Sequence, residues 1–378
     1  MSRFNKKKTE ASLTINRQGG SAYTRSAEYR LVSLLLTNFV TNQFYRSSNQ
    51  SLTELAELVE QVDPIFAAKA AVYARNEFGM RSISHALAAN LAAKATGTNW
   101  GRRFYDRIVR RPDDMLEITA AYLNAAGAGN NLTNAMKKGF AAAFDRFDGY
   151  QLAKYRGEGK AVKLVDVVNL VRPIPTKRNA AALQRLVAGT LRNAQTWESK
   201  LSAAGQAKGA TNKQVAKAEA WAELLTAKKL GYFALVRNLR NILEQAPECI
   251  DLVEAQLTDA GRIRKSLVLP FRLVSAYKEV RELKEPKQET AGSMGPFTAL
   301  QDLFKGAKTD RPRRPKFSAL RRRVLAALEK AINISCGNLP DLRNSLVAID
   351  NSGSMGSPAA GSDKIKCNEL GALFGIAL

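Results

Sequence analysis

From about residue 26 onward, apolar side chains recur with the three-to-four-residue period of an amphipathic α-helix. The segment SLTELAELVEQV is representative of this pattern. It places on one helical face the residues Leu52, Leu55, Ala56, Leu58 and Val59. This pattern predicts a helix over 51–62 with one buried side.

The same period predicts a long series of short helices. In the next one, Asp63 is in position to cap the N-terminus and Pro64 occupies the first helical position. The joints are short and rich in Gly, Pro or Asn, and no strand hairpin is predicted before residue 340. The predicted helices cover 51–62, 63–80, 81–97, 111–129, 131–147, 159–173, 179–201, 211–247, 270–280 and 317–335.

Many short helices joined by brief loops predict a mainly α fold. The favoured architecture is an α-solenoid of HEAT type, in which antiparallel helix pairs repeat about every 40 residues. The repeats share no clear consensus sequence, so a compact, irregular helical domain stays open as the alternative.

Composition divides the chain into four expected parts. We expect a flexible basic arm at 1–24, a helical-repeat domain at 25–285, a linker with a junction helix at 286–342, and the start of an α/β domain at 343–378. In the last part, SLVAID at 345–350 predicts a buried strand, followed by a Gly/Ser loop and a helix at 362–378. So short a segment cannot complete an α/β domain. We therefore expect either a fragment or a remainder supplied elsewhere.

The charge of the chain indicates an acidic partner. It carries 58 Lys or Arg against 34 Asp or Glu, a formal net charge of +24. Nucleic acid is the favoured partner, with an anionic membrane or a merely soluble basic protein as alternatives. No signal peptide and no stretch of about 20 apolar residues is present, and three scattered cysteines suggest neither disulfides nor zinc. We expect a cytoplasmic protein.

The middle of the helical region supplies the candidate RNA-binding residues, because residues 101–240 contain 25 Lys or Arg against 11 Asp or Glu. Clustered cations bind phosphates, and an aromatic ring can stack on an unpaired base. Some candidates also have a structural explanation. Tyr155 can belong to the core, Arg237 can pair with a carboxylate, and Lys137 and Lys138 can form a solvated face. The candidates are Lys137, Lys138, Lys154, Tyr155, Arg156, Lys160, Lys163, Arg237 and Arg240.

A second motif, D-x-S-x-S, directly follows the predicted strand and consists of Asp350, Ser352 and Ser354. One carboxylate and two hydroxyls are hard oxygen ligands suited to Mg²⁺ or another divalent cation. The alternative is a Ser/Gly turn that caps the next helix. The sequence offers no serine-hydrolase elbow and no other catalytic constellation, so we expect a protein that is not an enzyme.

Several stretches carry a resemblance to a known family. They are YARNEFGMRSISHALAANLA, TWESKL followed by GYFALVRNLRNI, RIRKSLVLPFRLVSAYKEV with Ile263, Pro270, Phe271, Ala276 and Tyr277, and ALEKAINIS before the D-x-S-x-S motif. Together they resemble the TROVE module, and most closely the bacterial proteins of the Ro autoantigen family. The C-terminal motif resembles the metal-ion-dependent adhesion site of a von Willebrand factor A domain. In that family a threonine and a second aspartate come from later loops that this chain does not contain.

The resemblance implies a ring of helical repeats and a set of partners. Ro proteins bind single-stranded 3′ ends of misfolded non-coding RNA through the ring and Y RNA on its outer surface, without catalysis, in RNA quality control or small-RNA stabilisation. The resemblance also suggests a 3′-to-5′ exoribonuclease such as polynucleotide phosphorylase as a partner. We further expect a monomer with no membrane partner. The alternative function is a metal-dependent protein-interaction module in which RNA binding is incidental.

Overall fold

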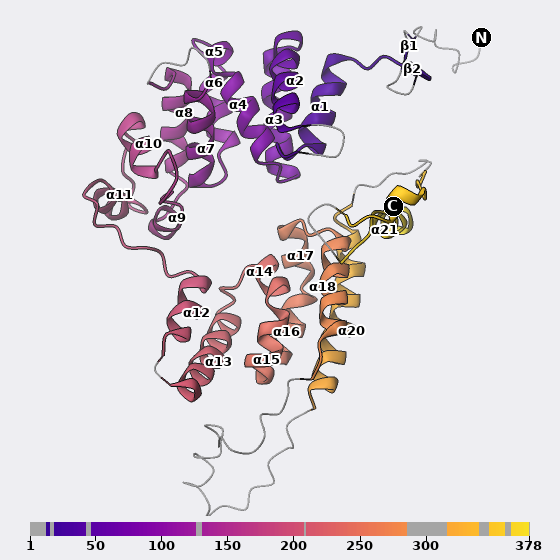
Figure 1. Cartoon of the computed structure of the whole chain (residues 1–378). Coiled ribbons are helices and arrows are strands. Elements are labelled where there is room, and N and C mark those ends of the chain that lie inside the picture. Colours follow the sequence, from indigo (N-terminus) through magenta and orange to yellow (C-terminus); the bar gives the residue numbers. More distant parts are fainter. Residues whose placement is uncertain are drawn as a thin grey trace, which may run out of the picture. The chain divides into compact units, whose positions relative to one another are not determined.

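A computed structural model of the chain describes residues 13–15, 19–42, 47–125, 131–207, 209–285, 316–339, 348–359 and 364–377. The chain divides into two compact units, Met1–Ala194 and Gln195–Leu378. Figure 1 shows that helices dominate both units. The mainly helical fold predicted from the apolar period is thus confirmed.

Unit 1 begins with a short antiparallel hairpin, β1 (Leu13–Ile15) and β2 (Ser21–Tyr23), in which Thr14 pairs with Ala22. The helices that follow are α1 (Ala27–Thr37), α2 (Ser48–Gln61), α3 (Pro64–Glu77), α4 (Ser82–Asn90), α5 (Ala92–Ala95), α6 (Gly101–Ile108), α7 (Pro112–Leu123), α8 (Asn134–Phe144), α9 (Gly149–Lys154), α10 (Leu164–Val171) and α11 (Ala180–Val187). Local signals start these helices as expected: Asp63 caps α3 by accepting a 2.8 Å hydrogen bond from the Phe66 N–H, ahead of Pro64.

The helices of unit 1 pack as two layers. One layer contains α1, α3, α6 and α8, each of which contacts the next, and the other contains α2, α4, α7 and α10 in the same way. Successive helix pairs therefore stack so that helices of the same layer lie side by side, as in an α-solenoid. This order favours the predicted solenoid over an irregular helical domain. The buried core between the layers includes Leu58, Ile83, Tyr105 and Phe140.

The tightest helix pair, α6 with α8, depends on a glycine. A Cβ at Gly139 would lie 2.4 Å from the Cβ of Tyr105 and 2.8 Å from the carbonyl oxygen of Arg102. Only a residue without a side chain allows the two backbones to approach this closely. Tyr105 is itself fixed, because its hydroxyl donates a 2.7 Å hydrogen bond to the Ala88 carbonyl of α4.

Unit 2 contains a second helical array with its own core. That core surrounds Trp221, Leu225, Leu239, Ile242 and Leu328, all of which are buried. The long helices α18 and α20 pack along each other. The elements are α12 (Trp197–Gly205), α13 (Ala210–Thr226), α14 (Tyr232–Arg237), α15 (Leu239–Gln245), η1 (Pro247–Cys249), α16 (Ile250–Leu257), α17 (Ala260–Ser266), α18 (Pro270–Glu282), α20 (Phe317–Cys336), η2 (Gly353–Gly356) and α21 (Cys367–Ala377).

The C-terminal α/β segment is described only in part. Residues 340–347, which include half of the predicted strand at 345–350, lie outside the described residues, and 348–350 are not assigned to a strand. The predicted final helix is confirmed as α21, which contacts η2 and α18. Its relation to a von Willebrand factor A domain stays a prediction, as do the four expected domain boundaries.

Two details of the predicted elements are wrong. The β1–β2 hairpin is not predicted, because each strand has only three residues, too few for an alternating pattern to be recognised. Leu13 and Ile15 are 71% and 73% exposed. Several predicted helices are also interrupted: 211–247 breaks after Thr226 and again at Asn238. Apolar periodicity persists across such breaks because the following helix buries the same side.

Candidate nucleic-acid interface

A buried ion-pair network joins two consecutive repeats of unit 1, and Asp114 on α7 lies at its centre. The Asp114 side chain is fully buried and accepts hydrogen bonds of 2.8 and 3.0 Å from the guanidinium of Arg75 on α3. The backbone N–H groups of Arg110 and Arg111 donate to the same carboxylate at 2.8 and 3.0 Å. A buried carboxylate with this many donors holds the start of α7 against α3.

The network continues through His85 on α4 to Glu117, one turn beyond Asp114. Nδ1 of His85 lies 2.8 Å from Oε2 of Glu117. The guanidinium of Arg81 bridges Oε1 of Glu117 and Oδ2 of Asp113, both at 2.9 Å. Nε2 of His85 lies 3.2 Å from Asp114 but is not aligned for a hydrogen bond. His85 is therefore a buried histidine that links α4 to α7.

The network perturbs the pKa of both acids. Burial by itself raises the pKa of Glu117, but the hydrogen bond from His85 and the charge of Arg81 outweigh it and lower that pKa to about 2. Burial likewise opposes ionisation of Asp114, yet His85 and Arg75 hold its pKa well below its usual range. Glu117 is thus a carboxylate at neutral pH, so Nδ1 of His85 carries the proton and donates it.

This network leaves no local motif in the amino-acid sequence. Its members lie about 30 to 40 positions apart, as in the Arg75–Asp114 pair, which 39 positions separate. Only the stacking of one helix pair on the next brings them together. The one sequence feature that hints at the network is the pair of adjacent acids, Asp113 and Asp114, within an otherwise basic region.

The network reaches the predicted RNA-binding segment at 154–163. Nζ of Lys160 lies 3.4 Å from Oε1 of Glu117, at the exposed edge of the network. The guanidinium of Arg111 lies over the ring of Tyr155, 4.7 Å from its centroid, in a cation–π contact. Tyr155 is half-buried, and Lys154 also lies near it, with Nζ 5.6 Å from the centroid. The ring is therefore already covered on at least one side by a cation of the protein.

The remaining basic residues of this segment differ in how far they are exposed for contact with RNA. Arg156 is mostly buried and its guanidinium donates to the Leu191 carbonyl and to Asn193, so it holds the chain on to the 191–193 loop. Lys154 and Lys163 are exposed at the end of α9 and the start of α10. Their contact with RNA stays a prediction, whereas the bonds of Arg156 favour a structural part for that residue.

The other basic candidates of unit 1 lie on α8. Lys138 is exposed and Lys137 half-buried, and within the described residues neither makes an ion pair. On the adjacent helix α6, three arginines that the sequence analysis did not select are exposed and equally without ion partners among the described residues. They are Arg102, Arg103 and Arg107.

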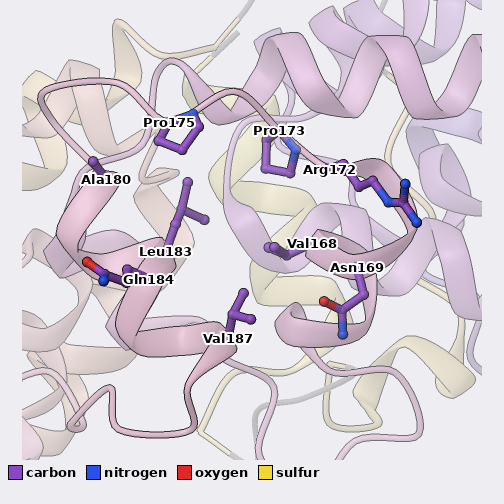
Figure 2. Close-up of a pocket in the computed structure, with 9 residues that line it drawn as sticks. All are labelled: Val168, Asn169, Arg172, Pro173, Pro175, Ala180, Leu183, Gln184 and Val187. Carbon is purple, nitrogen blue, oxygen red and sulfur yellow. The ribbon is translucent and has the colours of Figure 1, made fainter.

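A cavity of about 610 Å³ lies between α10 and α11. Figure 2 shows the side chains of Val168, Leu183 and Val187 converging on this space, while the guanidinium of Arg172 points away from it. Asn169 and Gln184 supply its side-chain amides. The cavity is mainly apolar, with a single cation at its edge.

In unit 2, Arg237 and Arg240 line one groove between α14, α15 and α18. They belong to different helices, because α14 ends at Arg237 and α15 starts at Leu239. Arg240 pairs with Glu244 at 3.0 Å, whereas Arg237 has no ion pair within the described part of the chain. Asn238 caps a backbone carbonyl, that of Ala234, at 2.8 Å.

The three predicted metal ligands lie together on an exposed loop. Oγ of Ser352 lies 3.1 Å from Oγ of Ser354, and Oδ1 of Asp350 accepts a 2.8 Å hydrogen bond from the Ser352 N–H. Hydrogen bonds from Ser352 lower the pKa of Asp350, so the carboxylate is charged at neutral pH. Among the described residues, no group of three or more His, Cys, Asp or Glu side chains is placed to hold a metal ion.

The layers and surfaces define a helical-repeat protein with an excess of exposed basic side chains. The model of the TROVE domain family matches residues 24–199 and 166–344. The chain therefore belongs to the TROVE domain family. No described helix is long and apolar enough to cross a membrane.

Individual proteins show the same relationship. The chain is 23% identical over 372 residues to telomerase protein component 1 of Mus musculus, covering 75% of this chain and 14% of that protein. The corresponding values for the Rattus norvegicus protein are 22% over 357 residues, 71% and 13%. The chain thus spans about a seventh of the length of these curated relatives.

A solved structure shows a similar fold. The RO (RSR) protein of Deinococcus radiodurans superposes with a TM-score of 0.59 at 19% identity, covering 93% of this chain and 73% of that one. At this identity the likeness shows the fold alone. The similar fold agrees with membership of the TROVE domain family.

Proposed function

We propose that this protein binds single-stranded 3′ ends of misfolded or structured non-coding RNA through a ring of helical repeats, and Y-like small RNA on its outer surface. It would act in RNA quality control or small-RNA stabilisation by binding and not by catalysis. The resemblance of the chain to Ro proteins supports this proposal, as does its membership of the TROVE family.

The observation that carries the proposal is the free positive charge on α6 and α8. Within the described residues, Arg102, Arg103, Arg107 and Lys138 are exposed and make no ion pair. Exposed cations without internal partners keep their full charge for an external anion. Each one that contacts a phosphate releases condensed counterions from RNA, which is a favourable contribution to binding.

The test is a salt titration of RNA binding with two labelled RNAs of equal length, one with a single-stranded 3′ tail and one blunt. We expect tighter binding of the tailed RNA, with log K falling against log salt by about 0.7 per phosphate contacted. Lys138→Glu with Arg103→Glu should weaken binding and reduce the slope, while Lys265→Glu, an exposed lysine of unit 2, serves as control. Equal affinity for both RNAs, or no dependence on salt, would contradict the proposal.

The proposal also includes a cytoplasmic location and an exoribonuclease partner such as polynucleotide phosphorylase, both suggested by the resemblance alone. Copurification of the tagged full chain with an exoribonuclease, before and after treatment with ribonuclease, tests the partner. An association that persists without RNA would indicate direct protein contact, and no association under either condition would remove this part.

A second candidate function is a metal-dependent protein-interaction module at Asp350, Ser352 and Ser354. Adjacent ligands of an octahedral Mg²⁺ with bonds of about 2.1 Å lie about 3 Å apart, and the two serine hydroxyls are 3.1 Å apart. The ion would supply an open coordination position for an acidic group of a partner. Calorimetric titration with Mg²⁺ or Mn²⁺ tests the site; heat that is unchanged by Asp350→Ala would refute it.

A further inference from the structure

The groove between α14, α15 and α18 combines an apolar floor with cations at its rim. Its volume is about 610 Å³, within the range of clefts that take small ligands. Val236, Leu239 and Val280 lie at its base and are at least nine-tenths buried. The ring of Phe233 lines the same groove and is 40% exposed, which leaves an aromatic surface available to a ligand.

Three arginines line the groove, one from each helix: Arg237 on α14, Arg240 on α15 and Arg272 on α18. Arg237 and Arg272 form no ion pair within the described residues, and Arg240 shares its charge with Glu244 at 3.0 Å. Arg272 lies in the first turn of α18, where the helix dipole adds positive potential. The rim is therefore suited to an anion.

Opposite charges lie at different positions along the α18 side of the groove. Along α18 the groove is lined by Arg272, Ser275, Ala276, Glu279 and Val280, a spacing that keeps them on one helical face. Seven residues of helix separate Arg272 from Glu279, a rise of about 10 Å. This is comparable to the length of one nucleotide. The Glu279 carboxylate repels a phosphate, so an anionic group is directed along α18 toward Arg272.

We propose that this groove binds one unpaired nucleotide of an RNA strand. Its phosphate is held by Arg237, Arg240 and Arg272, and its base lies against Phe233 and the apolar floor. A base within a duplex cannot enter, because its faces are stacked on its neighbours. The groove thus selects single-stranded RNA. This inference rests on the proposed RNA-binding function and deepens it, by adding Arg272 and Phe233 to the contacts predicted from sequence.

The experiment measures fluorescence anisotropy of a labelled ten-nucleotide oligouridylate with the full chain at several salt concentrations. Arg272→Ala should weaken binding about tenfold, as expected for a charge-assisted hydrogen bond, and reduce the salt slope by about 0.7. Phe233→Ala should weaken binding about five- to 100-fold through lost stacking, and leave the slope unchanged. Arg322→Ala removes an exposed arginine of the same unit and should have no effect.

A ten-unit abasic ribose-phosphate strand separates the two contacts. Arg272→Ala should still weaken its binding, whereas Phe233→Ala should not, because no base remains to stack. Thermal denaturation of each variant, together with Phe233→Leu and Arg272→Lys, distinguishes loss of contact from loss of folding. We expect Phe233→Leu to fold normally and to lose most of the base-dependent binding.

The outcomes separate this inference from the function on which it rests. If the unmodified chain binds no RNA, the proposed function fails. If it binds tailed RNA while the Arg272 and Phe233 variants match Arg322→Ala, only the groove assignment is overturned. Competition by polyglutamate as strong as by oligouridylate at equal charge would also overturn it, because an acidic peptide would then fit the groove as well.

Discussion

Replacement of Asp114 by asparagine tests the buried network most directly. The change keeps the shape of the side chain but removes its charge, leaving the guanidinium of Arg75, whose side chain is 6% exposed, without its carboxylate. Removal of one partner from a buried ion pair costs about 3–5 kcal/mol. For a unit of about 200 residues, 1 kcal/mol shifts Tm by about 2–4 °C. The melting temperature of unit 1 should therefore fall by roughly 10 °C.

Differential scanning calorimetry of the full chain is the appropriate assay, because it resolves separate unfolding transitions in a chain of two compact units. Asp166→Asn is the matched control, because Asp166 is exposed and accepts one hydrogen bond, of 2.8 Å, from the Lys163 N–H. Its loss should cost about 1 kcal/mol. The double change Arg75→Met with Asp114→Asn should recover part of the stability, because it removes the unpaired guanidinium and keeps a side-chain acceptor for the N–H groups of Arg110 and Arg111. A fall of less than about 2 °C for Asp114→Asn, or one equal to that of Asp166→Asn, would refute the role of this pair.

Glu117 stabilises the folded state above its unfolded pKa, near 4.5, and loses that contribution as pH falls toward its folded pKa of about 2. Urea unfolding at several pH values should show that the free energy of unfolding drops in this window and that Glu117→Gln abolishes the drop. A pH profile that the substitution leaves unchanged would contradict this prediction. Gly139→Ala should lower the free energy of unfolding by about 1–3 kcal/mol, because the added methyl group forces Tyr105 and α6 away from α8. Gly149→Ala is the control and should be tolerated, because its Cβ would meet its nearest atom at 3.3 Å. Equal melting temperatures of the two variants would refute the close packing at Gly139. Asp350→Ala should abolish the loss of the free-Mn²⁺ signal that binding causes in electron paramagnetic resonance titrations, without changing Tm. Retained binding would show that the loop is not the site.

The sequence was sufficient to predict a mainly helical fold, because helix formation depends largely on residues close together in the chain. The apolar period, the Asp63 cap and the Pro64 start all act within a few residues of one another, and α3 forms where they predict. The excess of basic residues likewise needs no structure to be seen. The β1–β2 hairpin could not be predicted because its strands have three residues each, too few for a periodic pattern to be distinguished from chance.

Contacts between helices decided what each candidate residue does. Arg156 and Lys138 are both cations in the same basic region, yet Arg156 donates to the 191–193 loop while Lys138 is exposed and unpaired among the described residues. Likewise, the groove that collects Arg237 and Arg272 exists only because α14 and α15 pack on α18.

The sequence by itself therefore determined a basic, helical-repeat protein, because periodicity and net charge are properties of the chain taken locally or in sum. Only the tertiary structure decided that His85, Asp114 and Glu117 form one buried network, and which cations stay free to meet an anion. The physical reason is that a charge is neutralised by whatever lies within a few ångströms of it, and the stacking of distant helices sets those neighbours.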